Sequence, residues 1–379
     1  PLEPLEVDGA VFQPVVVREN EHLAVPGERR VVERNHARIS EYLHKEAIDA
    51  PAWPAAAATR GVLNRALAWG AVATTHTISA DDGTALAIHT EGAGDSAVLF
   101  VHGATFGARP AFATPGYSWL TACADAGRAA YALDARGYGD SERPAAMNTE
   151  PGGEPPVRAD VAADDLATAL EHVRARHDGV HLIGYSWGSM VAGVALERGA
   201  PVESVTMYAP VYAPDPDRVA EFDPGNPPAP KREATRAETR DRWDAHFGDG
   251  DPTRYRDAEA FEAFWETLHD EQGVSGGEPT IEAPNGTLAD LTEAAGAGPV
   301  YDAGAVSAPT LVVRGSLDRT ATRADGLALY DALGSDDHEY AEVSGGSHFL
   351  ALERRRDVLF DRVRAFHDRI EGEPGGADR

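Results

Sequence analysis

The sequence predicts an α/β fold, in which a mostly parallel sheet is flanked by helices and interrupted by an inserted helical segment. From residue 72 onward, apolar runs of strand length alternate with segments of helical periodicity, which is typical of βαβ units. The run at 97–101, Ala-Val-Leu-Phe-Val, is apolar throughout, as expected of a strand buried on both faces. The alternation stops at 211–306 and then resumes, which indicates one large insertion.

The individual elements follow from turn signals and apolar spacing. Asp81-Asp82-Gly83 separates two alternating runs and predicts a hairpin of strands at 73–80 and 85–90. In the segment 160–177, Val161, Leu166, Leu170 and Val173 recur at helical spacing. On the same grounds we expect further helices at 117–127, 187–198, 324–333 and 350–370, and further strands at 129–133, 180–184, 202–208, 309–314 and 338–343.

The pattern divides the chain into four parts. We expect an α/β core at 72–210 and 307–370, a helical cap at 211–306 and a polar tail at 371–379. The cap begins with a proline-rich stretch, followed by helical patterns near 232–247 and 258–270. Residues 1–71 form an N-terminal helical arm, with an amphipathic helix at 34–46. This arm packs on the core, forms an oligomer contact or borders a substrate entrance.

Composition excludes several classes of protein. The formal net charge is −28, whereas binding of nucleic acid requires a basic surface. No apolar run is long enough to span a membrane. The single cysteine, Cys123, excludes an intrachain disulfide and is expected to be a small buried hydrophobe. No metal or cofactor is expected, because the sequence has no H-E-x-x-H motif, no P-loop and no complete dinucleotide fingerprint.

The N-terminus and the charge leave two questions open. The start lacks a basic segment followed by an apolar run, so a cytoplasmic protein is expected. Because the chain begins at Pro1, secretion stays open as an alternative. The acidic surface is explained equally by salt adaptation or by a GC-rich genome, since only Lys45 and Lys231 are lysines among 34 basic residues.

The strongest functional signal is Gly184-Tyr-Ser186-Trp-Gly188. It matches G-x-S-x-G and lies between an apolar strand and a helix, which is the context of a nucleophile elbow. The turn is so sharp that side chains at Gly184 and Gly188 would collide with neighbouring backbone. Ser186 is therefore the predicted nucleophile.

A serine hydroxyl needs a base, and the base needs an orienting acid. His348 is the best-placed histidine, because it follows the last predicted strand in Gly345-Gly-Ser-His348. Asp318 lies just after the strand at 309–314, and the order Ser186, Asp318, His348 is that of a hydrolase triad. Asp215, after the strand that follows the elbow helix, is the rival acid.

An acyl-transfer site also needs donors for the oxyanion. We expect the backbone N–H of Trp187, directly after the nucleophile, to be one of them. The loop His102-Gly103-Ala104-Thr105 follows a buried strand, and the N–H of Ala104 is the predicted second donor, with Thr105 as the next choice. His102 is expected to support this loop.

Taken together, these motifs resemble those of the α/β-hydrolase superfamily, in particular its capped esterase-like and lipase-like members. They are His102-Gly103, Asp134-Ala-Arg-Gly-Tyr-Gly-Asp-Ser141, Gly184-Tyr-Ser-Trp-Gly188, Gly315-Ser-Leu-Asp318 and Gly346-Ser-His348, in the order of the family. The resemblance covers about residues 72–370. It implies an α/β-hydrolase fold with an eight-stranded, mostly parallel sheet and a cap after strand six. Ser186 stands where haloalkane dehalogenases and epoxide hydrolases have a carboxylate.

The resulting hypothesis is a serine hydrolase that cleaves a carboxylic ester or lactone through an acyl-enzyme on Ser186. Thr105, Tyr185, Trp243 and Trp265 are the expected substrate-binding residues, and a small apolar acyl or lactone compound is the expected substrate. Cap aromatics at helical spacing also suit a core. The alternatives are an amidase or peptidase, a carbon–carbon hydrolase, or a silent ligand-binding member of the family. A homo-oligomer is possible.

Overall fold

The computed structural model describes residues 5–7, 10–12, 73–272 and 280–372. The chain forms two compact units, Pro1–Gly70 and Ala71–Arg379. In the first unit, β1 (Leu5–Val7) pairs antiparallel with β2 (Ala10–Phe12). The rest of the predicted arm, including the helix at 34–46, lies outside the described residues.

The second unit contains an eight-stranded sheet with the order β12-β11-β8-β7-β5-β6-β4-β3. The predicted hairpin is confirmed, because β3 and β4 pair antiparallel, and β4 also runs antiparallel to β6. All other neighbours are parallel. The predicted eight-stranded, mostly parallel sheet is thus confirmed. Its strands are β3 (Thr74–Ser79), β4 (Ala85–Glu91), β5 (Ser96–Val101), β6 (Ala129–Leu133), β7 (Gly179–Tyr185), β8 (Ser204–Tyr208), β11 (Thr310–Gly315) and β12 (His338–Val343).

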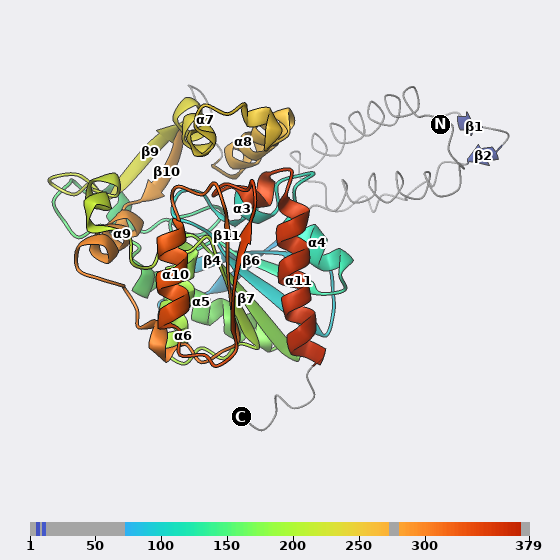
Figure 1. Ribbon diagram of the computed structural model, residues 1–379, viewed down its shortest axis with the longest axis horizontal. Helices are drawn as coiled ribbons and strands as arrows, with labels where there is room; N and C mark the ends of the chain where they lie inside the picture. Colours follow the sequence, from blue (N-terminus) through green and yellow to red (C-terminus); the bar gives the residue numbers. More distant parts are fainter. Residues whose placement is uncertain (1–4, 8–9, 13–72, 273–279, 373–379) are drawn as a thin grey trace. The chain divides into compact units, whose positions relative to one another are not determined.

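Helices cover both faces of this sheet, and this explains its apolar central strands. In Figure 1, α5 (Ala159–Arg174), α6 (Trp187–Glu197) and α10 (Arg323–Ala332) lie on one side. The helices α4 (Trp119–Asp125) and α11 (Arg356–Gly372) lie on the other. Residues 97–101 of β5 have no exposed surface, as its continuous apolar run predicts. A short helix, α3 (Ala108–Phe112), and the 3-10 turn η1 (Ala145–Asn148) were not predicted.

The closing helix differs from the prediction of one element at 350–370. The chain forms a 3-10 turn, η6 (Leu350–Leu352), and only then α11, which continues to Gly372. The break falls at Glu353, whose backbone is extended and whose side chain is fully buried. Its carboxylate accepts hydrogen bonds from Ser347 and Trp243, and these contacts hold the chain out of helical conformation there. Of the predicted tail, residues 373–379 lie outside the described residues.

The insertion between β8 and β11 is less helical than predicted. Residues 231–235 form β9 (Lys231–Thr235), which pairs antiparallel with β10 (Thr280–Pro284), so the helix expected at 232–247 begins later. Thr235 and Glu238 form a capping box that starts α7 at Arg236. The other elements are η2 (Pro216–Glu221), α7 (Arg236–Asp244), η3 (Ala245–Phe247), η4 (Pro252–Arg254), α8 (Ala258–Gln272), α9 (Gly286–Gly296) and η5 (Ala303–Ala305).

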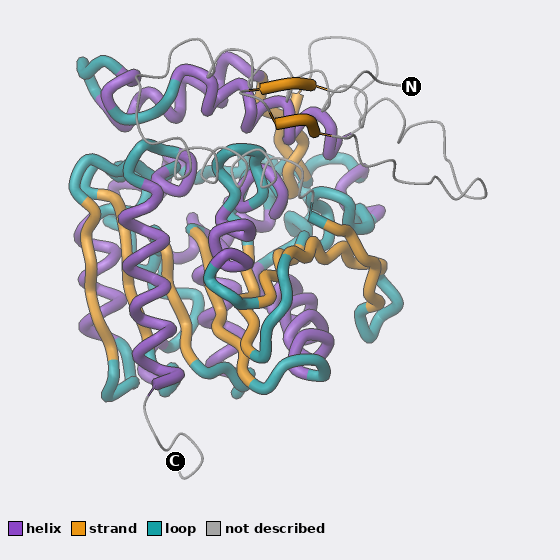
Figure 2. The backbone as a smooth tube through the Cα atoms, turned by 90° about the vertical axis from the view of Figure 1, so that its right-hand side faces the viewer, coloured by secondary structure: helices purple, strands orange, loops and turns teal. Residues whose placement is uncertain are grey.

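The insertion lies over the carboxyl ends of the parallel strands. Figure 2 shows α7 and α8 above one end of the sheet, and two contacts identify that end. Arg242 of α7 donates to Thr105, in the loop after β5, over 2.9 Å. His246 of η3 accepts the backbone N–H of Arg319, in the loop after β11, over 3.0 Å. In open α/β sheets this edge is where ligands bind.

Candidate active site

The turn between β7 and α6 holds Ser186 in a strained conformation. Its φ of 55° and ψ of −120° lie in a region that non-glycine residues rarely adopt. The two flanking glycines are required, because a Cβ on Gly184 would lie 2.5 Å from the carbonyl oxygen of Gly188. A Cβ on Gly188 would lie 2.4 Å from the carbonyl oxygen of Val101. This is the geometry expected of a nucleophile elbow.

The structure brings Ser186, His348 and Asp318 together in one chain of hydrogen bonds. Nε2 of His348 lies 3.0 Å from Oγ of Ser186, and Nδ1 lies 2.8 Å from Oδ2 of Asp318. The three residues are 6%, 1% and 4% exposed, so little water competes for these bonds. With the proton of His348 on Nδ1, Nε2 is free to accept the serine proton.

Each partner of the serine is fixed by its own neighbours. Oδ1 of Asp318 accepts the backbone N–H groups of Thr320 and Ala321 over 2.8 and 2.9 Å, which leaves Oδ2 for the histidine. The backbone carbonyl of His348 accepts the hydroxyls of Tyr185 and Tyr208 over 3.0 and 3.2 Å. The histidine loop is therefore held from the sheet below.

The rival acid, Asp215, occupies a different environment. It is the N-cap of η2, and its Oδ1 accepts the backbone N–H of Asp217 over 2.9 Å in an exposed turn. Its carboxylate therefore has a local role in the turn. The carboxylate beside His348 is that of Asp318.

The predicted oxyanion loop passes close to Ser186. A Cβ on Gly103 would lie 3.2 Å from Cβ of Ser186. Among the described residues, the N–H groups of Ala104 and Trp187 have no hydrogen-bond acceptor, so both are available to a ligand. The carbonyl of Ala104 accepts the hydroxyl of Tyr138 over 2.8 Å and a second bond from Nη2 of Arg232.

His102 supports this loop from below. Its Nε2 accepts the backbone N–H of Ala135 over 3.1 Å, so the proton is on Nδ1, which donates to the carbonyl of Gly103 over 2.8 Å. Burial lowers the pKa of His102, which favours this neutral form. The ring is therefore a fixed link between the oxyanion loop and the loop after β6.

The loop after β6 owes its shape to Asp134. Its Oδ2 lies 2.8 Å from Nε2 of His89 and accepts the backbone N–H of Asp140 over 3.0 Å, while Oδ1 accepts that of Ala108 over 2.6 Å. His89, Asp134 and Asp140 are close enough to hold a cation. Both oxygens of Asp134 already accept these hydrogen bonds, so a role in shaping the loop explains why the three side chains lie close together.

A cavity of about 150 Å³ adjoins the triad. Thr105, which follows Ala104, and Phe349, which follows His348, both line it. Ser186 is not one of its lining residues. The remaining wall comes from the insertion, through Glu233, Ala234, Glu238, Thr239 and Arg242, and from Phe106, which follows Thr105 in the chain.

The other predicted substrate-binding residues lie elsewhere. Trp243 is fully buried, stacks on Phe349 with ring centroids 4.8 Å apart and donates its indole N–H to Glu353 over 2.9 Å. Trp265 is 6% exposed and stacks on Phe261. Tyr185 is buried beneath His348. None of the three lines the cavity, whereas Thr105 does.

Sequence reasoning missed two residues of the insertion, His246 and Arg242. The ring of His246 stacks near that of His348, with centroids 6.1 Å apart, and burial lowers the pKa of His246 to about 4. Arg242 reaches the oxyanion loop through Thr105. No local motif marks either one, because their positions depend on how the insertion packs over the sheet.

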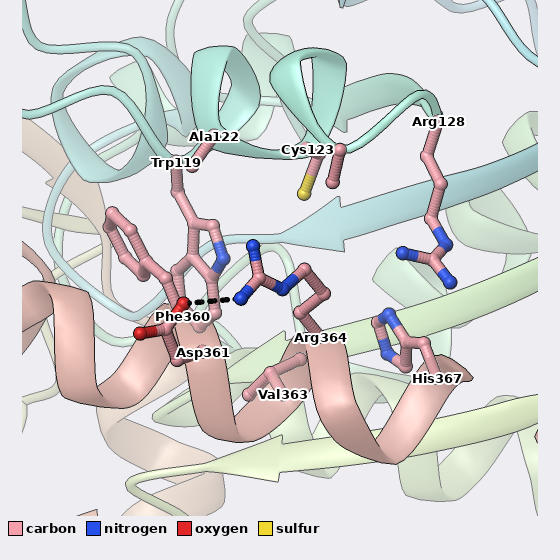
Figure 3. A pocket seen from close by; sticks show the side chains of 10 residues that line it. Trp119, Ala122, Cys123, Arg128, Phe360, Asp361, Val363, Arg364 and His367 are labelled. Carbon is pink, nitrogen blue, oxygen red and sulfur yellow. Dashed lines mark ion pairs between the residues drawn. The ribbon is translucent and has the colours of Figure 1, made fainter. Parts of the chain in front are cut away.

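A second, smaller cavity of about 60 Å³ lies between α4 and α11, away from the triad residues. Figure 3 shows Cys123 and Trp119 on one wall and His367 and Arg364 on the other. Cys123 is partly exposed, and burial raises the pKa of its thiol to about 12. The thiol is therefore protonated and unreactive at neutral pH, in agreement with a packing role.

The sequence matches the model of an alpha/beta hydrolase family over residues 98–362, more than half of the chain. The chain belongs to the alpha/beta hydrolase family. No curated protein matches it in sequence. Within the described residues, no helix of this family member is long and apolar enough to cross a membrane.

Solved structures share the fold at low sequence identity. A bromoperoxidase from Bacillus anthracis is 20% identical, with a TM-score of 0.53, and the match covers 78% of this chain and 100% of that one. An esterase from Exiguobacterium antarcticum is 15% identical, with a TM-score of 0.54 and coverages of 79% and 100%. A meta-cleavage product hydrolase is 16% identical, with a TM-score of 0.56 and coverages of 78% and 98%. At these identities the likeness concerns the fold alone.

Proposed function

We propose that this protein is a serine hydrolase that cleaves a carboxylic ester or lactone through an acyl-enzyme on Ser186. The observation that carries the proposal is the hydrogen-bonded chain from Ser186 through His348 to Asp318, with distances of 3.0 and 2.8 Å. Oγ of Ser186 attacks the carbonyl carbon while Nε2 of His348 takes its proton. The same proton then passes to the leaving alcohol.

The oxygen of the tetrahedral intermediate becomes negatively charged and needs nearby donors. The free N–H groups of Ala104 and Trp187 are the proposed donors, because both belong to segments that border Ser186. Trp187 is the first residue of α6, so the partial positive charge of the helix end adds to its effect. In the second half of the reaction, water deprotonated by His348 releases the acid product.

The experiment combines covalent labelling with turnover. A fluorophosphonate should add one label to the intact protein by mass spectrometry, and Ser186→Ala should remain unlabelled. A panel of nitrophenyl esters, lactones and anilides then identifies the bond that is cleaved. Labelling of the Ser186→Ala protein, or undiminished turnover by it, would refute the proposal.

A further inference from the structure

The insertion places one guanidinium beside the triad without a carboxylate partner. Arg242 is accessible from the cavity that it lines, and its hydrogen bond to a neighbour is the one from Nη1 to Oγ1 of Thr105. Within the described part of the chain, no acidic group lies at ion-pair distance from it. The other arginines of the same helix differ, because Arg236 and Arg240 both pair with Glu262.

The acidic residue at helical spacing from Arg242 forms no ion pair with it among the described residues. Glu238 lies one helical turn earlier, at the spacing that favours an ion pair along a helix. Its Oε2 instead accepts the backbone N–H and the hydroxyl of Thr235, over 2.7 and 2.9 Å, and these bonds cap α7. Among the described residues, Arg242 therefore has no ion pair, although Asp318 attracts its charge through space and Glu233 and Glu238 line the same cavity.

The surroundings make this charge available to a ligand. In the neighbouring Arg232, Nη1 donates to Pro284, Asn285 and Thr287 and Nη2 donates to Ala104, so this side chain is part of the framework. An arginine carries five N–H donors in a planar fork, and the Thr105 bond uses one of them. A planar carboxylate is the group that such a fork binds best, through two parallel charge-assisted hydrogen bonds.

We propose that Arg242 binds a carboxylate of the substrate, so that the enzyme prefers compounds bearing a second, anionic end. This inference rests on the proposed function of Ser186 and replaces the expected apolar substrate with an acidic one. The cavity has room for a group of a few atoms. Thr105 links Arg242 to the oxyanion loop, so the bound carboxylate would fix the reacting carbonyl relative to Ala104.

The test uses pairs of substrates that differ only in charge. On the acyl side, the mono-4-nitrophenyl ester of adipic acid is compared with 4-nitrophenyl hexanoate. On the alcohol side, 4-acetoxybenzoate is compared with its methyl ester. In at least one pair the anionic compound should have the higher kcat/KM. Arg242→Met should reduce the anionic-to-neutral ratio about 10- to 100-fold, as expected for lost hydrogen bonds to a charge.

Two controls separate recognition from structure. Arg240→Met, on the same helix, removes an arginine that pairs with Glu262 and should leave the ratio unchanged. Arg242→Lys should restore part of the preference. A wild-type protein without preference in either pair, or an unchanged ratio in Arg242→Met, would overturn the proposal while leaving ester hydrolysis intact.

A binding measurement distinguishes the two proposals. Calorimetry on the Ser186→Ala protein compares monomethyl adipate, which is anionic, with dimethyl adipate, which is neutral. Binding of the monoester that disappears in the Ser186→Ala, Arg242→Met protein supports the site even where the wild-type protein hydrolyses no ester. Equal binding of the monoester by both proteins contradicts the site.

Discussion

Oδ2 of Asp318 lies 2.8 Å from Nδ1 of His348, while Oδ1 of the same carboxylate accepts two backbone N–H groups. The two oxygens are therefore not equivalent. In Asp318→Asn, the amide oxygen will take the place facing the backbone donors, so the NH₂ group will face His348. That arrangement keeps the imidazole proton on Nε2 of His348, so Nε2 cannot accept the proton of Ser186.

We expect Asp318→Asn to lower kcat by about 10³- to 10⁴-fold without unfolding the protein; the upper value is that of the corresponding change in a serine protease. Steady-state turnover of a nitrophenyl ester, together with circular dichroism, measures both effects. Asp215→Asn is the matched control, because Asp215 caps an exposed turn and its replacement should change kcat little. The reverse ranking of the two variants would assign the acid role to Asp215.

Gly188 should tolerate no side chain. A Cβ there would lie 2.4 Å from the carbonyl oxygen of Val101 and 2.5 Å from that of His102, and buried backbone atoms at the end of the central strand β5 cannot move aside. We expect Gly188→Ala to lower the free energy of unfolding by about 3 kcal/mol or to prevent folding, measured by urea titration. Gly153→Ala is the control, since a Cβ at Gly153 meets nothing within 4 Å. Equal midpoints would contradict the steric argument.

His246 should make stability depend on pH. Burial, and then the neighbouring His348, lower the pKa of His246 from 6.5 to about 4. The unfolded chain binds a proton near pH 6.5, but the folded protein does so only near pH 4. The contribution of His246 is thus complete above pH 6.5, declines as pH falls toward 4, and changes no further below it.

The expected loss over this window is about 3 kcal/mol. Asn at position 246 keeps an oxygen to accept the N–H of Arg319 but does not titrate. Urea unfolding at pH 7, 6 and 5 should show a flatter pH dependence for His246→Asn than for the wild type. His76→Asn, at an exposed position, is the control. Parallel curves for wild type and His246→Asn would disprove the assignment.

Trp243 should contribute to stability more than to substrate choice. Its indole N–H donates to the buried Glu353, which also accepts the backbone N–H of Ser347. Trp243→Phe removes one donor from a buried carboxylate and should destabilise the protein by about 1–3 kcal/mol. Trp265→Phe, the control, removes a similar volume, and within the described residues the indole of Trp265 has no such bond. Equal unfolding midpoints, or a changed order of preference among acyl chains in Trp243→Phe alone, would contradict this role.

Ser186, His348 and Asp318 could be predicted from the sequence because short segments around them determine their structure. Ser186 sits in a turn that requires glycine two residues before and after it, so the motif itself carries the structure. Asp318 follows the apolar strand β11, whereas β12, which precedes His348, reads His-Glu-Tyr-Ala-Glu-Val. The two strands are parallel neighbours, so the topology brings their ends together. The fold was predictable for the same reason, since central strands such as β5 and β11 are apolar runs.

The insertion was predicted less well because its contacts are distant and polar. The strand β9 reads Lys-Arg-Glu-Ala-Thr, without apolar alternation, and its partner β10 lies about 50 residues later in the chain. The pairing with β10 stabilises β9 as a strand, although its own sequence has no strand pattern. Similarly, the break at Glu353 depends on Trp243 from the insertion, so it cannot be recognised within the segment 350–370 alone.

Through Arg232, the insertion also anchors the oxyanion loop. From β9 it donates to the carbonyl of Ala104 in the oxyanion loop, alongside the hydroxyl of Tyr138. A chimaera that exchanges this insertion for that of another family member would thus remove an anchor of the loop as well as a wall of the cavity. Selectivity and rate would then change together. A graft that transfers only α7 and α8, and retains the β9–β10 hairpin with Arg232, would change the selectivity while preserving the rate.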